Sequence, residues 1–157
     1  METTNLQPEY YSAFNQPISG LDYLTVIMNG NIPYPPLLQT LDFKAVNITE
    51  GEVVFSFIPQ LLHNNSINTV HGGVISAILD TAMGCALHST LPAGTSYTTI
   101  ELKTNFLRAV TLKSGELRAI GKIIYLGGQT ALTEAQLLDT QNRLFAHGVS
   151  TCLIFKI

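Results

Sequence analysis

The chain has 157 residues, of which 12% are charged, and it carries a formal net charge of −3. This length suffices for one domain with a sizeable hydrophobic core. The few, scattered basic residues argue against a nucleic-acid partner, and no apolar run approaches the roughly 20 residues that a membrane-spanning helix needs.

The first 59 residues predict an arm, a short helix and two strands. Residues 1–16 are polar and aromatic without a period, which is typical of an extended arm. Residues 17–29 predict a short helix that ends at Asn29-Gly30-Asn31. Residues 38–47 and 52–59 have the composition of strands on either side of a turn. We therefore expect an N-terminal arm and short helix over 1–34, followed by one domain over 35–157.

A long helix and four more strands follow. The helical segment begins near His71 and includes Gly84. Strand signals then cover 97–110, 115–125, 130–139 and 144–155, separated by turn residues such as Gly127-Gly128. Two strands, a helix and four strands in meander order predict an α+β fold, in which one antiparallel sheet wraps round a long central helix.

The central helix contains an isolated carboxylate. Asp80 is the only charged residue between Glu52 and Glu101, and a buried, unpaired carboxylate costs several kcal/mol. At about 100° per residue, mostly small residues share its face, so a ligand could approach it. The opposite face, which includes Cys85, is predicted to pack in the core. The residues predicted on the Asp80 face include Gly73, Ser76, Ala77, Met83 and Gly84.

The start of the helix is a second candidate site. His71-Gly72-Gly73 offers no Asp or Ser as N-cap, and its glycines leave the first N–H groups open to an anion or a developing oxyanion. Gly73 and Asp80 are seven residues apart, or roughly 10 Å along a helix axis. A two-fold dimer with antiparallel helices would place Asp80 of one chain near Gly72 of the other.

Composition also predicts assembly and location. A typical soluble protein is about 25% charged, so we expect much of this surface to be buried in a homodimer or homotetramer. The N-terminus lacks the basic and then apolar pattern of an export signal. Cys85 and Cys152 form no C-x-x-C pair, which is typical of reduced cysteines in a cytoplasmic protein.

The run Asn65-Ser66-Ile67-Asn68-Thr69-Val70-His71-Gly72-Gly73, followed by Leu79-Asp80-Thr81-Ala82, resembles the hotdog-fold acyl-CoA thioesterases, and within them the PaaI-like branch named after phenylacetic acid degradation. The resemblance covers roughly residues 35–157. It implies the hotdog fold and hydrolysis of an acyl-CoA thioester, with no metal and no cofactor. One departure is Asn68, where relatives commonly have glycine.

The resemblance also implies roles for individual residues. Asp80 matches the general base or nucleophile, and Gly72 matches the glycine whose N–H polarises the thioester carbonyl. Asn65 matches a residue that orients the thioester or the attacking water. Thr99 lies where relatives position that water, and His71 matches an organiser of the glycine turn.

The substrate is expected to contact both ends of this site. We expect the acyl group in a pocket beside Asp80, lined by residues such as Ser76 and Met83, with Gly73 at the helix start. Coenzyme A is expected at the surface, near Arg108 and Gly128.

Structural roles remain alternative interpretations for several of these residues. Asp80 could be a helix polar group paired with Thr99, and Asn65 could bond only its own loop. Two other functions also remain open. A hotdog dehydratase would need a catalytic histidine with a downstream helix Glu, which this helix lacks. A non-catalytic acyl-CoA-binding protein would share the fold without the hydrolysis.

Overall fold

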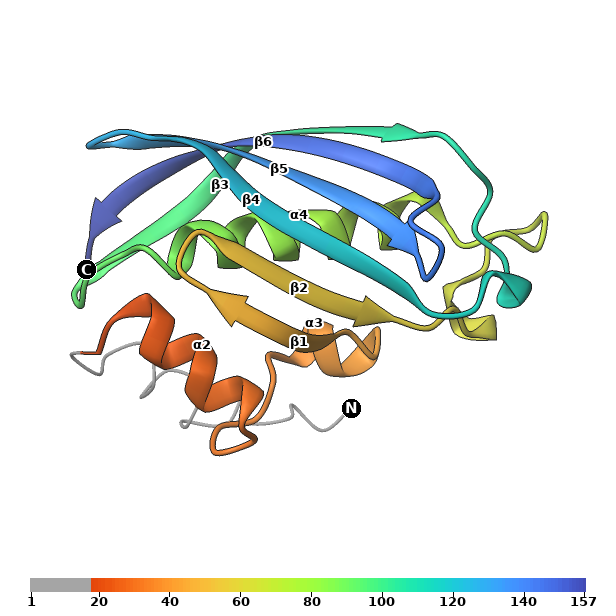
Figure 1. Ribbon diagram of the computed structural model, residues 1–157, viewed down its shortest axis with the longest axis horizontal. Helices are drawn as coiled ribbons and strands as arrows, with labels where there is room; N and C mark the ends of the chain where they lie inside the picture. Colours follow the sequence, from red (N-terminus) through yellow and green to blue (C-terminus); the bar gives the residue numbers. More distant parts are fainter. Residues whose placement is uncertain (1–17) are drawn as a thin grey trace, which may run out of the picture.

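The apolar segment that follows His71 forms helix α4 (Gly72–His88) in the computed structural model, which describes residues 18–157. The helix is apolar nearly all round, and it lies inside the curve of the sheet (Figure 1). Its fully buried side chains pack against strands on the concave face, and they include Ile78, Leu79, Ala82, Met83, Ala86 and Leu87.

Six strands form one antiparallel sheet. They are β1 (Lys44–Thr49), β2 (Glu52–Phe57), β3 (Thr95–Phe106), β4 (Leu117–Leu126), β5 (Thr130–Asp139) and β6 (Leu144–Lys156), and their order is β1-β2-β4-β5-β6-β3. The single antiparallel sheet round a helix is confirmed. The meander order was wrong for β3, which pairs with β6 instead of β4 because β2 occupies that edge of β4.

This order makes β3 an edge strand. It pairs with β6 along one side, from Thr95 opposite Lys156 to Phe106 opposite Ala146, and within residues 18–157 no strand pairs with its other side. Ile100 is 58% exposed on this strand and Leu102 is 38% exposed. The edge therefore offers both unpaired backbone groups and apolar side chains to a neighbouring molecule.

The N-terminal elements pack beside β1. Helix α2 (Gly20–Met28) begins after Ser19, whose hydroxyl accepts a hydrogen bond from the Asp22 N–H, and it lies within the predicted 17–29. The predicted strand over 38–47 was wrong at its start, because Pro36 opens a short helix, α3 (Pro36–Thr40). Asp42 then turns the chain at φ 51° into β1. The predicted arm over 1–16 lies outside the described residues.

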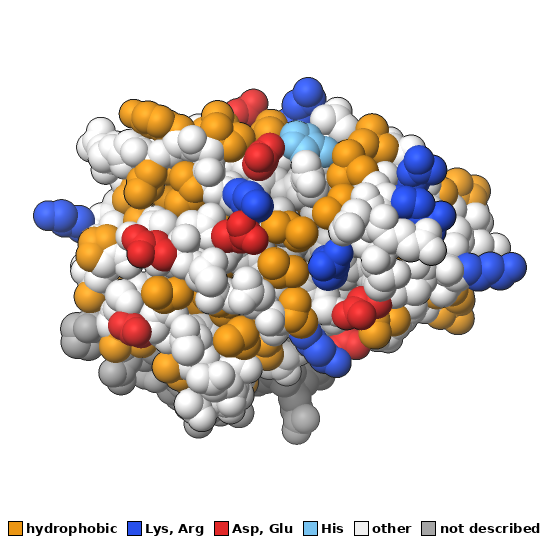
Figure 2. All heavy atoms as spheres, viewed as in Figure 1, with side chains coloured by type: hydrophobic (Ala, Val, Ile, Leu, Met, Phe, Trp, Pro, Cys, Tyr) orange, Lys and Arg blue, Asp and Glu red, His pale blue; other side chains and the backbone are white. Residues whose placement is uncertain are grey.

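Charged and apolar side chains are mixed on the surface. On the face shown in Figure 2, hydrophobic side chains lie between acidic and basic ones. Two single-turn helices, Leu61–His63 and Leu112–Ser114, complete the described elements. No helix within residues 18–157 has the length and the apolar character needed to cross a membrane.

Candidate active site

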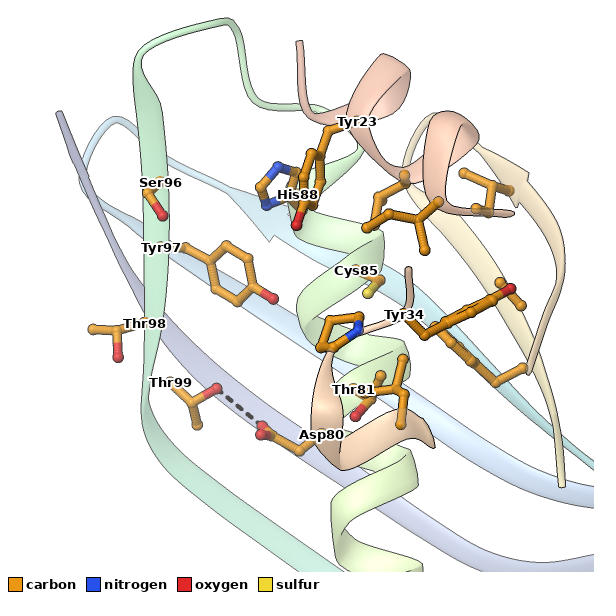
Figure 3. Close-up of a pocket in the computed structure, with 17 residues that line it drawn as sticks. Tyr23, Tyr34, Asp80, Thr81, Cys85, His88, Ser96, Tyr97, Thr98 and Thr99 are labelled. Carbon is orange, nitrogen blue, oxygen red and sulfur yellow. Dashed lines mark hydrogen bonds between the residues drawn. The ribbon is translucent and has the colours of Figure 1, made fainter. Parts of the chain in front are cut away.

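Asp80 lies half-buried on α4 and faces strand β3. The Thr99 hydroxyl donates a hydrogen bond to Asp80 Oδ1 at 2.9 Å (Figure 3). Asp80 Oδ2 accepts no hydrogen bond from any side chain or backbone group of residues 18–157. Burial raises the pKa of Asp80, and the hydrogen bond from Thr99 opposes this rise only in part. The higher pKa makes the ionised carboxylate a stronger proton acceptor.

A cavity of about 420 Å³ opens beside this pair. It lies between α4 and β3 on one side and α2, α3, β1 and β2 on the other. Its lining is mainly apolar, and Asp80 is the only Asp, Glu, Lys or Arg among the described residues that line it. Such a volume is typical of a pocket for a small molecule or for part of one.

The face of α4 that lines the cavity differs from the face that we predicted for the acyl group. Thr81, Cys85 and His88 join Asp80 there, at spacings that place the three on one side of a helix. Met83 is fully buried in the core, because the sheet covers its side of α4. Ser76 is half-buried, and its hydroxyl contacts the Thr104 hydroxyl at 3.4 Å.

The thiol of Cys85 has no expected part in the chemistry. It packs against the core, as expected, and it also lines the cavity. Burial raises its pKa to about 12, and the nearby Asp80 carboxylate adds to this rise. A thiol with this pKa stays protonated near neutral pH and is a poor nucleophile.

The start of α4 is capped by the histidine of the His-Gly-Gly motif. The Nδ1 atom of His71 accepts a hydrogen bond from the Gly73 N–H at 2.9 Å, as an Asp or Ser N-cap would. The N–H groups of Val74 and Ile75 bond the His71 carbonyl. The Gly72 N–H has no acceptor among residues 18–157, so it remains free to bind a ligand oxygen.

Asn65 holds the loop in front of this helix start. Its Oδ1 atom accepts hydrogen bonds from the N–H groups of Ile67 and Thr69, and its Nδ2 donates to the Thr69 hydroxyl at 2.9 Å. Asn68, in the same loop, has φ 60°, a conformation that asparagine tolerates better than most residues. The side-chain oxygen is therefore used by the loop, while one N–H of the Asn65 amide has no partner among the described residues.

The predicted site residues fall into separate places on one chain. Asn65, Gly72 and Arg108 line a groove at the start of α4, whereas Asp80 and Thr99 line the cavity. Eight residues separate Gly72 from Asp80, or about 12 Å along the helix axis. Gly128 lines a third depression, between the β4–β5 turn and the segment that follows α4.

Of the residues that line the cavity, only Asp80 and Thr99 were predicted as site residues; those missed from the sequence include Tyr23, Thr81, His88 and Tyr97. The spacing of 81, 85 and 88 on α4 is a helical signal that could have identified one wall. Tyr97 could have been found from Thr99, because side chains two apart in a strand share a face. No local signal places Tyr23 of α2 against α4.

Residues 67–146 match the family described as the thioesterase superfamily, and the chain belongs to this family. A protein of Archaeoglobus fulgidus, provisionally named an esterase, is 27% identical over 70% of this chain and 69% of its own length. The PaaI protein of Escherichia coli, from the phenylacetic acid degradation operon, shares 20% identity and superposes with a TM-score of 0.74 over 88% of this chain and 94% of its own.

A Streptococcus mutans protein solved with bound acetyl-CoA has a TM-score of 0.67 and 22% identity, and the match covers 73% of this chain and 89% of that one. At sequence identities of 20% and 22%, the structural similarity is evidence for the fold. The predicted α+β hotdog fold and the resemblance to PaaI-like thioesterases are thus confirmed.

Proposed function

We propose that the protein hydrolyses acyl-CoA thioesters to a free acid and coenzyme A, with Asp80 as general base or nucleophile. The observation that carries the proposal is the Asp80–Thr99 pair at a largely apolar cavity, to which residues 18–157 contribute no other Asp, Glu, Lys or Arg side chain. A carboxylate with an open oxygen and a raised pKa suits proton transfer from water. The cavity beside it suits an acyl group.

The reaction needs three contributions from the protein. Asp80 takes a proton from water as the water oxygen adds to the carbonyl carbon, or its own carboxylate adds first and forms an anhydride that water then cleaves. The carbonyl oxygen gains negative charge, which a free N–H at a helix start stabilises. The carbon–sulfur bond breaks, and coenzyme A leaves as a thiolate that takes up the proton.

Gly72 is the proposed oxyanion donor, and its distance from Asp80 on the same helix favours a site shared by two chains. In this arrangement two antiparallel α4 helices place the Gly72 N–H of one chain beside Asp80 of its partner. The exposed edge of β3, with Ile100 and Leu102, is a surface that such a homodimer would bury. A two-fold axis then creates two identical sites, whether the assembly is a dimer or a tetramer.

Coenzyme A is proposed to lie outside the cavity. Arg108 is exposed in the groove beside Gly72, where it could bind a phosphate. The acetyl-CoA bound to the Streptococcus mutans relative supports this ligand class. The free thiols Cys85 and Cys152 agree with action in the cytoplasm.

A panel of acyl-CoA thioesters, with release of free coenzyme A measured by a thiol-trapping dye, tests the proposal. We expect turnover of at least one substrate, and loss of this turnover when Asp80 is replaced by Asn. Binding of acyl-CoA without thiol release by the wild-type protein would indicate the non-catalytic alternative. Loss of water from 3-hydroxyacyl-CoA without thiol release would indicate the dehydratase.

A further inference from the structure

The wall of the cavity opposite Asp80 comes from the N-terminal part of the chain. Tyr23, Leu24 and Ile27 of α2 line it, together with Tyr34 and Leu38. The family match covers residues 67–146 and therefore includes Asp80 and Thr99 but not this wall. Residues that contact the acyl group from α2 can thus set substrate preference without touching the reacting atoms.

Close packing fixes α2 against the end of α4. The Gly20 N–H donates a hydrogen bond to the Leu91 carbonyl at 2.9 Å. A Cβ atom at Gly20 would lie only 1.8 Å from the His88 carbonyl oxygen, so only glycine allows this approach. This contact therefore fixes the approach of α2 to the end of α4, where Tyr23 and His88 line the cavity.

Three aromatic rings line the end of the cavity that lies beside the last turns of α4, away from Asp80. The ring centroids of Tyr23 and His88 are 5.5 Å apart, and those of His88 and Tyr97 are 5.8 Å apart (Figure 3). His88 is eight residues beyond Asp80, or about 12 Å along α4. An extended alkyl chain advances about 1.3 Å per carbon, given bonds of about 1.5 Å, so roughly eight to ten carbons reach this end.

The groups at this end are uncharged near neutral pH. Burial lowers the pKa of His88 and raises the pKa values of Tyr23 and Tyr97. No Lys or Arg lines the cavity within residues 18–157. An acyl group that ends in a carboxylate would lose its hydration without gaining a counter-charge, which is unfavourable.

We propose that Tyr23, His88 and Tyr97 limit the length of the acyl group, and that the cavity selects uncharged acyl groups with a length of roughly eight to ten carbons. This inference rests on the proposed function, because it assigns the cavity to the acyl part of the thioester. It assigns specificity to three side chains that are distant from the reacting carbon.

Chain-length profiles of kcat/KM test the proposal, with straight acyl-CoA substrates from acetyl to hexadecanoyl. Each buried methylene is worth about fourfold, so kcat/KM should rise steeply towards octanoyl and decanoyl and then fall. Suberoyl-CoA, which has the length of octanoyl-CoA but ends in a carboxylate, should react at least about tenfold more slowly.

Substitutions on either side of the length limit should move the optimum in opposite directions. His88→Ala and Tyr23→Ala enlarge the far end and should lengthen the preferred chain by about two carbons. Cys85→Leu adds bulk about halfway along the cavity and should shorten it. His147→Ala is the matched control, because His147 pairs with Glu134 on β5 and lies outside the cavity. This control should leave the profile unchanged.

Binding separates this inference from the proposed function. Alkyl thioethers of coenzyme A cannot be hydrolysed, and calorimetry with the Asp80→Asn protein measures their affinity directly. A chain-length optimum that shifts in Asp80→Asn/His88→Ala supports the length selection even if no thioester is turned over. Affinity that does not depend on chain length, or an optimum that the cavity substitutions leave in place, would overturn it.

Discussion

Two aspartates with low exposure lie in different regions of the molecule and have opposite surroundings. Asp139, at the β5–β6 turn, is 2% exposed, and its Oδ1 accepts hydrogen bonds at 2.9 Å from the N–H groups of Gln141 and Arg143. Its Oδ2 accepts one from Arg143 Nε at 2.6 Å. Asp80, on α4, accepts one side-chain hydrogen bond from within residues 18–157, donated by Thr99.

The pKa values of the two carboxyl groups are shifted in opposite directions because their hydrogen-bond donors differ. Burial tends to raise the pKa of Asp139, but the backbone and guanidinium groups of Arg143 and the Gln141 N–H outweigh it, so the net pKa is lowered. The pKa of Asp80 is raised, because its burial outweighs the hydrogen bond from Thr99. A carboxylate whose donors are all supplied by the fold stabilises a turn, whereas one with an open oxygen beside a cavity can act on a ligand.

The largest expected effect is a loss of activity on replacing Asp80, which replacing Asp139 should not cause. Asp80→Asn should lower kcat/KM by about 10²–10⁴-fold, the range for a positioned acid–base group. Thioester hydrolysis by purified protein measures this loss. Activity within a few-fold of the wild type would mean that Asp80 is structural like Asp139.

The same variant should not lose stability. Because the folded pKa of Asp80 is raised, its contribution to stability is present below the unfolded pKa and is lost as pH rises through the folded pKa. Near neutral pH the ionised group therefore costs stability, and the uncharged amide removes this cost. The Tm of Asp80→Asn at pH 7 should equal or exceed that of the wild type.

The next effect concerns the Gly72 N–H, the proposed oxyanion donor, which lies about 12 Å from Asp80 along the same helix. Gly72 is the first residue of α4, where proline fits, and His71 has the extended conformation (ψ 136°) that a following proline requires. Gly72→Pro removes the N–H and should lower kcat by about 10²–10³-fold.

Gly72→Ala is the control for this change. It keeps the N–H, and its Cβ atom would lie 3.2 Å from the ring of Phe106, which is 54% exposed and can move. Its kcat should stay much closer to that of the wild type. Equal losses in the two variants would argue that the Phe106 contact matters and the N–H does not.

A smaller effect is expected at Asp139, and on stability only. Asp139→Asn weakens the hydrogen bonds to Gln141 and Arg143, so the Tm should fall by several degrees. Turnover per folded molecule should remain. Thermal unfolding and kinetics on the same preparation measure the Tm and the turnover. A loss of turnover without a loss of stability would mean that Asp139, like Asp80, acts in the reaction.

The smallest effect is a shift of the pH profile. The Thr99 hydroxyl lowers the pKa of Asp80 by bonding its ionised form, so Thr99→Val should raise that pKa further. The acid limb of kcat/KM against pH should then move to higher pH. An unchanged limb with lower kcat would indicate that Thr99 acts on water instead.

The two candidate positions on α4 could be predicted from the sequence, because they depend on local signals, whereas nothing in the sequence singled out Asp139. Asp80 was conspicuous as the only charge in a long apolar segment, and the helix start was visible in His71-Gly72-Gly73. The placement of β3 beside β6 depends on long-range pairing that strand patterns do not encode. Tyr23 reaches the cavity through packing of α2 near the chain end, which no periodicity reveals.

The faces of α4 were partly misassigned for a related reason. The sequence favoured small residues such as Ser76 as the acyl wall, since they leave room for a ligand. The sheet instead covers Met83. The cavity lies beside Cys85 and is also lined by residues of α2 and β3. Helical spacing defines which residues share a face, but the neighbouring elements decide which face is open.

Mixing two inactive variants tests the shared site most directly. Asp80→Asn and Gly72→Pro chains, unfolded together and refolded at equal amounts, should regain roughly a quarter of wild-type activity. Random pairing gives half hybrids, and each hybrid dimer holds one intact site of two. The double variant Asp80→Asn/Gly72→Pro mixed with either single variant should stay inactive. Activity no higher than the sum of the separate parents, with hybrids confirmed by native mass spectrometry, would contradict a site built from two chains.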